Sequence, residues 1–152
     1  MKIKDMDLEQ LNGEWTGFFV YGNGYPATYR EKKNDFTIVV NGADGMIKGE
    51  CTDVFVRKYF TSPATIDGSF ENGAVTFIKR YPSLLTIDEN EKVTVFPDRP
   101  SHEVLYTGHV YKKLFSRKIY FKGRWDISGS FLDEDKNARY YTFGGTWEME
   151  KS

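Results

Sequence analysis

The sequence predicts an all-β fold, a closed antiparallel up-and-down β-barrel of about eight strands, or ten if an additional hairpin joins them. Three observations predict this class. Polar and apolar residues alternate along nearly the whole chain, glycines recur inside the alternating segments, and long and short links follow one another in turn. The 152 residues lie in the size range of one domain, so we expect one barrel domain over residues 1–152.

Eight segments show the period of two that half-buried strands require. The first, residues 13–21, puts Trp15, Phe19 and Tyr21 on one face. The others are residues 35–40, 46–53, 64–70, 74–81, 103–111, 118–127 and 139–150. Helix is expected only at residues 7–11, with Asp5 or Asp7 as the cap of a single turn.

Glycine recurs between two large apolar residues on one face of these segments. The pattern apolar-x-Gly-x-apolar is centred on Gly13, Gly49, Gly68, Gly108, Gly123 and Gly145. A glycine inside a strand weakens it, so this repetition on the inner face indicates strands that coil tightly around a narrow axis. The alternative is a β-sandwich in which the glycines mark scattered bulges.

The links between the segments alternate in length. Short links are expected at residues 41–45, 71–73 and 112–117, and long links at residues 22–34, 54–63, 82–102 and 128–138. Alternate links of an up-and-down barrel lie at opposite ends. We therefore predict a closed end with tight turns and an open end with long loops, where residues 84–87 and 93–96 pair as a hairpin that could serve as a lid.

A Gly-x-Trp motif occurs three times, as Gly13-Glu14-Trp15, Gly123-Arg124-Trp125 and Gly145-Thr146-Trp147. The first resembles the G-x-W signature of lipocalins, and the later two are similar to avidin strands. The chain thus resembles the calycins, which comprise lipocalins, fatty-acid-binding proteins and avidins. This resemblance implies a lipocalin-like or avidin-like barrel that binds small apolar or aromatic ligands at its open end.

The sequence departs from these families at two places. Residues 15–20 lack the Asn and the Gly-Ser pair with which avidins contact biotin. Lipocalins cover the tryptophan with an Arg, whereas Arg124 of this chain is predicted to face outward. Biotin is therefore not the expected ligand, and no clear partner for Trp15 is predicted.

The candidate ligand site consists of inward residues with apolar bodies and polar or charged tips. They are Tyr21, Asp53, Lys79, Tyr106, Trp125 and Tyr141. Such residues suit a small planar, apolar or amphipathic ligand, and the Trp125 N–H is an expected donor to it. An inward charge needs a partner, solvent or a ligand, so a salt bridge between Asp53 and Lys79 at the rim is the alternative reading.

Two other function classes stay open at this stage. An eight-stranded barrel can be filled by its own side chains, and would then act as a protein interaction module that displays Tyr25, Tyr29 and Phe96 as an aromatic patch. A barrel enzyme without a recognisable motif is the lesser alternative. No catalytic residue, metal site or cofactor is predicted, since His102 and His109 are expected on the surface and Cys51 in the core.

Charge and hydropathy limit the partners further. The 21 basic and 22 acidic residues give a formal net charge of -1 and are interspersed, which is unlike a general nucleic-acid binder. No segment approaches the length of a membrane span or a secretory signal, so we expect no membrane partner and a cytoplasmic location. The sequence makes no prediction of an oligomeric state.

Overall fold

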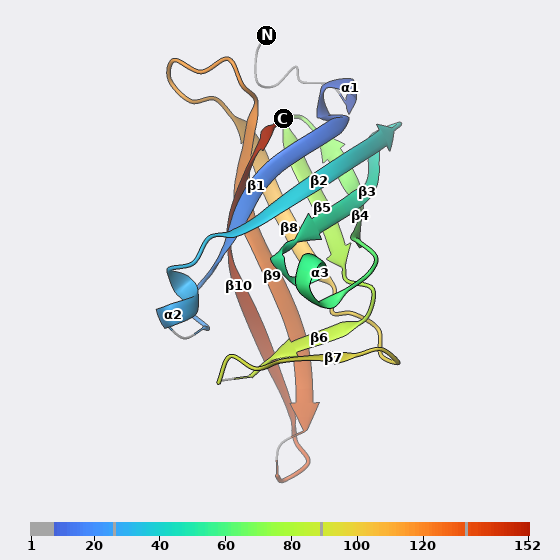
Figure 1. The fold of residues 1–152 in the computed structure, drawn as a ribbon, viewed down its shortest axis with the longest axis vertical. Helices are drawn as coiled ribbons and strands as arrows, with labels where there is room; N and C mark the ends of the chain where they lie inside the picture. Colours follow the sequence, from blue (N-terminus) through green and yellow to red (C-terminus); the bar gives the residue numbers. More distant parts are fainter. Residues whose placement is uncertain (1–7, 26, 89, 133) are drawn as a thin grey trace.

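The computed structural model shows a closed eight-stranded antiparallel barrel (Figure 1). It describes residues 8–25, 27–88, 90–132 and 134–152, apart from the side chains of residues 8, 129–132, 140 and 141. The barrel strands are β1 (Gly13–Tyr21), β2 (Asn34–Ala43), β3 (Met46–Asp53), β4 (Ala64–Glu71), β5 (Ala74–Arg80), β8 (Val104–Tyr111), β9 (Tyr120–Leu132) and β10 (Ala138–Lys151). Their order around the barrel is β1-β10-β9-β8-β5-β4-β3-β2, which confirms the predicted all-β up-and-down topology.

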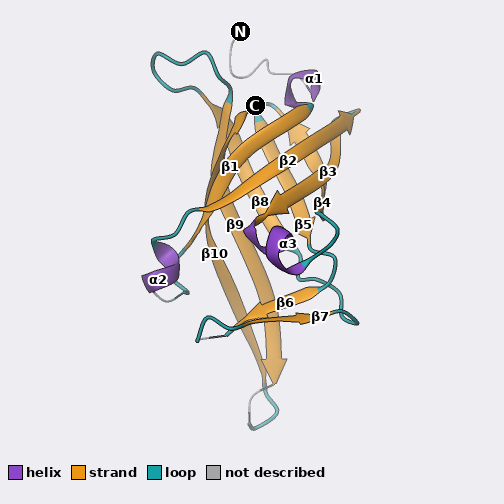
Figure 2. Cartoon of the chain, viewed as in Figure 1, coloured by secondary structure: helices purple, strands orange, loops and turns teal. Residues whose placement is uncertain are grey.

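The extra hairpin forms a sheet of its own. Its strands β6 (Leu84–Ile87) and β7 (Val93–Phe96) pair only with each other, so the barrel has eight strands and not ten. The hairpin lies across the lower end of the barrel in Figure 2. The predicted pairing of these two segments is therefore confirmed, and their position suits a cover.

Short helices occupy two links between strands, and a third short helix precedes the first strand. The predicted turn is α1 (Leu8–Leu11), whereas its expected caps Asp5 and Asp7 lie outside the described residues. Helices α2 (Ala27–Arg30) and α3 (Val54–Tyr59) were not predicted. Each stands in a long link at the open end, beside the hairpin (Figure 1).

The predicted difference between the two ends is present, with two corrections to the link lengths. Residues 128–132 continue β9 and pair with β10 as far as Leu132 and Ala138, so the long loop predicted at 128–138 is wrong. The two strands extend beyond the barrel (Figure 1). At the closed end, β9 starts at Tyr120, so the link before it spans residues 112–119.

The inner glycines are required where neighbouring strands approach closely. A Cβ added at Gly68 or Gly123 would overlap the backbone carbonyl of Thr76 or Thr107 on the next strand. The same kind of overlap would occur at Gly17, Gly49 and Gly145. This crowding supports the tight coiling inferred from the sequence. Gly13 differs, because it is exposed and begins β1 with a φ of 117° that other residues rarely adopt.

Large side chains fill the barrel from the closed end to its middle. The Trp15 ring meets Phe121 edge to face at 5.2 Å, and the Trp147 ring packs against Phe77 at 5.9 Å. Both indole N–H groups donate to backbone carbonyls, that of Trp15 to Leu11 at 2.7 Å. Among the described residues, the closed end and the middle of the barrel are therefore packed with side chains.

Candidate functional site

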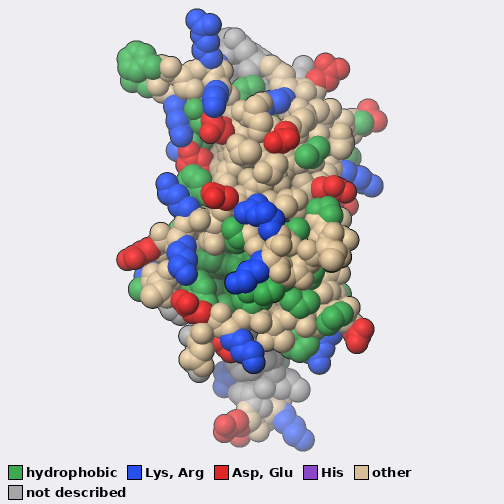
Figure 3. Space-filling model, viewed as in Figure 1, with side chains coloured by type: hydrophobic (Ala, Val, Ile, Leu, Met, Phe, Trp, Pro, Cys, Tyr) green, Lys and Arg blue, Asp and Glu red, His purple; other side chains and the backbone are tan. Residues whose placement is uncertain are grey.

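A cavity of about 640 Å³ lies at the open end of the barrel. Its barrel wall includes Phe19, Tyr21, Lys79, Val104, Tyr106 and Trp125, and its cover includes Tyr25, Tyr29, Phe55, Leu85 and Ile87 from the long links. In the space-filling view, hydrophobic side chains gather in a hollow at the level of α2 and α3, bordered by basic side chains (Figure 3). The cavity is therefore both apolar and accessible.

The barrel side of the cavity is a cluster of aromatic rings. Tyr21 is central, with its ring 4.5 Å from that of Tyr25 and 5.4 Å from that of Trp125. Phe19 lies edge to face with Trp125 at 6.0 Å. Rings at these separations and angles stabilise one another, so the wall is a packed aromatic surface.

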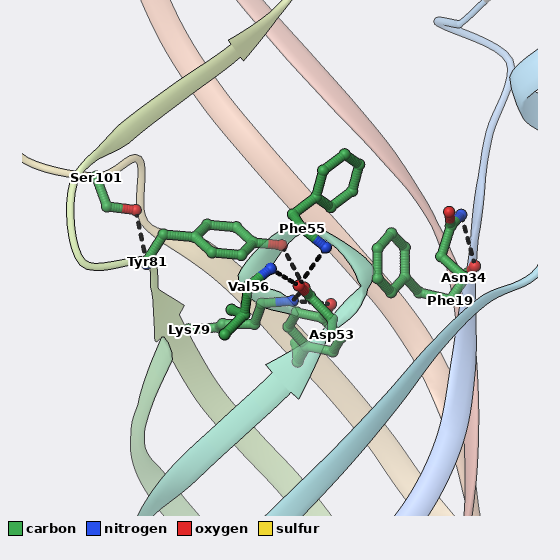
Figure 4. A network of polar contacts seen from close by, with 9 residues as sticks. Phe19, Asn34, Asp53, Phe55, Val56, Lys79, Tyr81 and Ser101 are labelled. Carbon is green, nitrogen blue, oxygen red and sulfur yellow. Dashed lines mark hydrogen bonds and ion pairs between the residues drawn. The ribbon is translucent and has the colours of Figure 1, made fainter. Parts of the chain in front are cut away.

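The floor of the cavity carries a buried ion pair. The Lys79 Nζ atom lies 2.7 Å from Asp53 Oδ2, and the side chains are 2% and 0% exposed. The Tyr81 hydroxyl donates to the same carboxylate oxygen (Figure 4). The other oxygen accepts from the backbone N–H groups of Phe55 at 3.0 Å and Val56 at 2.9 Å, so Asp53 is also the N-cap of α3.

Lys79 is the member of the pair that faces the cavity. Its side chain lines the cavity, whereas Asp53 lies behind it. The ammonium group lies 5.0 Å from the centroid of the Phe19 ring and 3.5 Å from the Tyr106 hydroxyl. A cation surrounded by aromatic rings is stabilised by their negative faces. The site therefore offers a ligand one fixed ammonium group within an aromatic wall.

The pKa shifts preserve both charges at neutral pH. Burial alone would raise the pKa of Asp53, but the Lys79 ammonium and the hydrogen bonds to the carboxylate outweigh it and lower that pKa. Burial would lower the pKa of Lys79, yet the groups around it, Asp53 among them, raise it well above its usual value. Burial raises the pKa of Tyr106 to about 12, so its hydroxyl remains neutral and able to donate.

The structure brings together most of the residues predicted for the site. Tyr21, Lys79, Tyr106 and Trp125 line the cavity, and Asp53 supports Lys79 from behind. The backbone of Tyr141 pairs with Gly129 in the extension of β10, but its side chain lies outside the described residues. The expectation for the Trp125 N–H is wrong, because that group donates to the Val20 carbonyl at 3.1 Å.

The residues that sequence reasoning missed come mainly from links. Phe55, Leu85 and Ile87 reach the cavity from α3 and the hairpin; the hairpin was expected as a lid, but none of its residues was assigned to the site. Tyr81 could have been found, since it follows Lys79 by two residues and thus shares its face. Asp53 before Val54–Tyr59 is a typical N-cap, which was the available signal for α3.

The aromatic patch expected for an interaction module does not form. Tyr25 and Tyr29 are half-buried and line the cavity, and Phe96 is half-buried with the Arg99 guanidinium 4.9 Å from its ring. His102, expected on the surface, is half-buried at the cavity rim, whereas His109 is exposed. Tyr25 and Tyr29 therefore belong to the cavity, whereas Phe96 does not line it.

Comparison with known proteins does not assign this chain to a family. No protein-family model matches this chain, and no curated protein is similar to it in sequence. Within the described residues, no group of three or more His, Cys, Asp or Glu side chains could hold a metal ion. The helices of the described residues include none long and apolar enough to cross a membrane.

Proposed function

We propose that this barrel binds a small apolar or amphipathic molecule in the cavity at its open end. The observation that carries the proposal is an aromatic cavity of about 640 Å³ with the Lys79 ammonium in its floor. Sites for small ligands commonly have volumes of roughly 300 to 1,000 Å³, mostly apolar walls and a few fixed polar groups. The cavity matches each of these features.

The polar groups favour a flat ligand that carries a hydrogen-bond acceptor. Lys79 and Tyr106 are both donors, and within the described residues the Tyr21 hydroxyl makes no hydrogen bond, so it too is available. Exposed Arg30, Arg57 and Lys58 on α2 and α3 add positive charge near the opening. A carbonyl or carboxylate placed at the floor, with an aromatic body against Trp125, would satisfy this arrangement.

The state of Lys79 favours binding over catalysis. A catalytic lysine must lose its proton to act as a nucleophile or a base, which requires a lowered pKa. Here the pKa is raised and Asp53 holds the ammonium form. We therefore assign Lys79 the role of a fixed cation that orients a ligand.

We also propose that the barrel is of the calycin type. Gly13-Glu14-Trp15 lies at the start of β1, directly after α1, and Trp15 fills the closed end. Lys151 at the end of β10 extends its ammonium group over the Trp15 ring, 5.6 Å from the centroid. A cation thus covers this tryptophan, as Arg does in lipocalins, although it is a lysine and comes from the last strand.

The binding proposal is tested with two fluorescent probes of similar size, the anionic anilinonaphthalene sulfonate and the neutral N-phenyl-1-naphthylamine. Both should bind the folded protein at one site per chain, and native mass spectrometry should show one adduct. Lys79→Met should lower the affinity for the anionic probe more than the affinity for the neutral probe, because only the anion is attracted by the ammonium group. Probe uptake that occurs only on unfolding would contradict the proposal.

The hairpin supplies a matched pair of variants for locating the site. Leu85 lines the cavity, whereas its neighbour Leu84 does not, and both are half-buried on β6. Leu85→Gln should weaken both probes, while Leu84→Gln should leave their affinity nearly unchanged. Equal effects of the two variants would place the probes elsewhere on the protein.

A further inference from the structure

The link between β8 and β9 exposes two large apolar side chains at the end of the barrel opposite the cavity. Leu114 is 84% exposed and Phe115 is 98% exposed. This link protrudes at the upper left of Figure 1, and a hydrophobic group projects at the same place in Figure 3. Two adjacent residues of this kind at the tip of a loop form an apolar projection that water solvates poorly.

The loop is held in a defined turn. The Ser116 N–H donates to the Lys113 carbonyl at 3.2 Å, so Leu114 and Phe115 occupy the two central positions. The Ser116 hydroxyl lies 3.0 Å from that of Tyr120 and accepts from the Lys118 N–H at 3.2 Å. Phe115 has a φ of 64°, which a bulky residue rarely adopts. The backbone thus turns both apolar side chains outward.

Basic residues surround the apolar pair. Lys112, Lys113, Arg117 and Lys118 are all exposed, and residues 112–125 contain no Asp or Glu. Lys113 pairs with Glu148 at 2.9 Å and Lys118 with Glu150 at 3.1 Å. Within the described residues, Lys112 and Arg117 make no ion pair, so the loop retains uncompensated positive charge beside its apolar tip.

We propose that this loop docks on the surface of an anionic lipid bilayer, with Leu114 and Phe115 inserted between the headgroups. An apolar tip followed by a basic collar matches the order of layers in such a surface, where phosphates lie outside the acyl region. Half-buried Tyr111 stands at the base of the loop, with its ring 5.4 Å from that of buried Tyr120, and tyrosine favours the interfacial region.

The proposed membrane contact is compatible with the rest of the molecule. We expected no membrane partner because the sequence has no spanning segment, but a loop that only enters the membrane interface needs none. The loop lies at the closed end, so a docked barrel would keep its cavity mouth in water. The inference is therefore independent of the proposed ligand.

Co-sedimentation with vesicles tests the inference on the full chain. The protein should bind vesicles of phosphatidylcholine mixed with phosphatidylglycerol and bind vesicles of phosphatidylcholine alone much more weakly. The variant Leu114→Ser/Phe115→Asn removes the apolar tip and keeps a residue that tolerates the left-handed backbone; it should reduce partitioning by about tenfold or more. Lys112→Gln/Arg117→Gln should reduce it by a similar factor on the anionic vesicles only.

A control variant separates loop docking from general adhesion. Leu105→Thr removes a side chain that is 38% exposed on the outer wall of β8, and binding should be unchanged. Failure of the wild-type protein to bind anionic vesicles would overturn the inference and leave an acidic protein surface as the remaining partner. Binding that survives in Leu114→Ser/Phe115→Asn would overturn it equally.

Discussion

The Lys79 ammonium and the Asp53 carboxylate lie 2.7 Å apart inside the barrel, where water scarcely reaches either group. One joins the pair from β5 and the other from the last residue of β3, which also starts α3. The same contact therefore fixes a helix at the cavity mouth and holds a cation in the cavity floor. Stability and the proposed binding site thus depend on one pair of side chains.

Removing one member of this ion pair should lower the free energy of unfolding far more than removing both members together. Lys79→Met leaves the Asp53 carboxylate without its cation, and Asp53→Asn leaves a buried ammonium while keeping an N-cap. Each should lower the free energy of unfolding by about 3 to 5 kcal/mol, the usual cost of one uncompensated buried charge. The double variant should lose much less than the sum, and denaturant titration of all four proteins measures this coupling.

An exposed ion pair that includes the next residue of β5 provides the comparison. Arg80 Nη2 lies 3.0 Å from Glu103 Oε2, with the side chains 42% and 60% exposed. Arg80→Gln and Glu103→Gln should each change the free energy of unfolding by less than about 1 kcal/mol. If the losses of unfolding free energy were equal and additive at both ion pairs, burial would not strengthen the pair between Lys79 and Asp53.

Alkaline pH should destabilise the barrel through its buried phenols. The pKa of Tyr106 rises from 10.0 to about 12 on folding, because burial disfavours the phenolate. Above pH 10.0 the unfolded chain loses this proton before the folded chain does, so stability that is complete below that pH is lost as the pH rises toward the folded value. Urea titrations across this range should show a shallower loss in Tyr106→Phe; identical slopes would contradict the assignment.

The barrel itself could be predicted because its signals are local and repeated. Alternation places Phe19 and Tyr21 inward without knowledge of the fold, and the recurrent glycines report strand crowding that only tight coiling produces. The inward charges of Asp53 and Lys79 were predicted by the same rule. Their meeting across β4, which lies between β3 and β5 in the closed barrel, is not specified by alternation alone.

The hairpin over the cavity was predicted as a lid, but the individual residues that cover the cavity could not be predicted in the same way. Phe55, Leu85 and Tyr25 reach it from links whose paths depend on contacts made after the barrel closes. The extension of β9 and β10 beyond the barrel was hidden for a related reason, since residues 128–132 carry the small polar residues typical of a loop. Cross-strand pairing outweighed that local preference.

Lys151 should stabilise the closed end more than an ordinary surface lysine does. Its ammonium group donates to the carbonyls of Gln10 and Asn12, the latter at 2.6 Å, and covers Trp15. Lys151→Met leaves both carbonyls without this donor and should lower the free energy of unfolding by about 1 to 3 kcal/mol. Amide exchange should show faster opening of residues 10–16 in particular.

Lys118 is the matched control for this measurement. It pairs with Glu150 at 3.1 Å while 61% exposed, so Lys118→Met should cost less than about 1 kcal/mol. If the two methionine variants unfold alike, the contact between Lys151 and Trp15 has no structural role.

The tryptophans should separate into structural and ligand-binding residues. Trp15 and Trp147 are buried between the cavity and the closed end and are 0% and 2% exposed, so their replacement by Ala should cost about 3 to 5 kcal/mol through cavity formation. Trp125 lines the cavity, and Trp125→Leu retains much of the apolar volume. This substitution should cost less stability, including about 1 kcal/mol for the lost hydrogen bond to Val20. It should also lower the affinity for the fluorescent probes, because it removes an aromatic ring from the cavity wall. Thermal melts and probe titrations on the three variants measure both effects; unchanged probe affinity in Trp125→Leu, together with equal stability losses at all three sites, would show that the cavity is not the binding site.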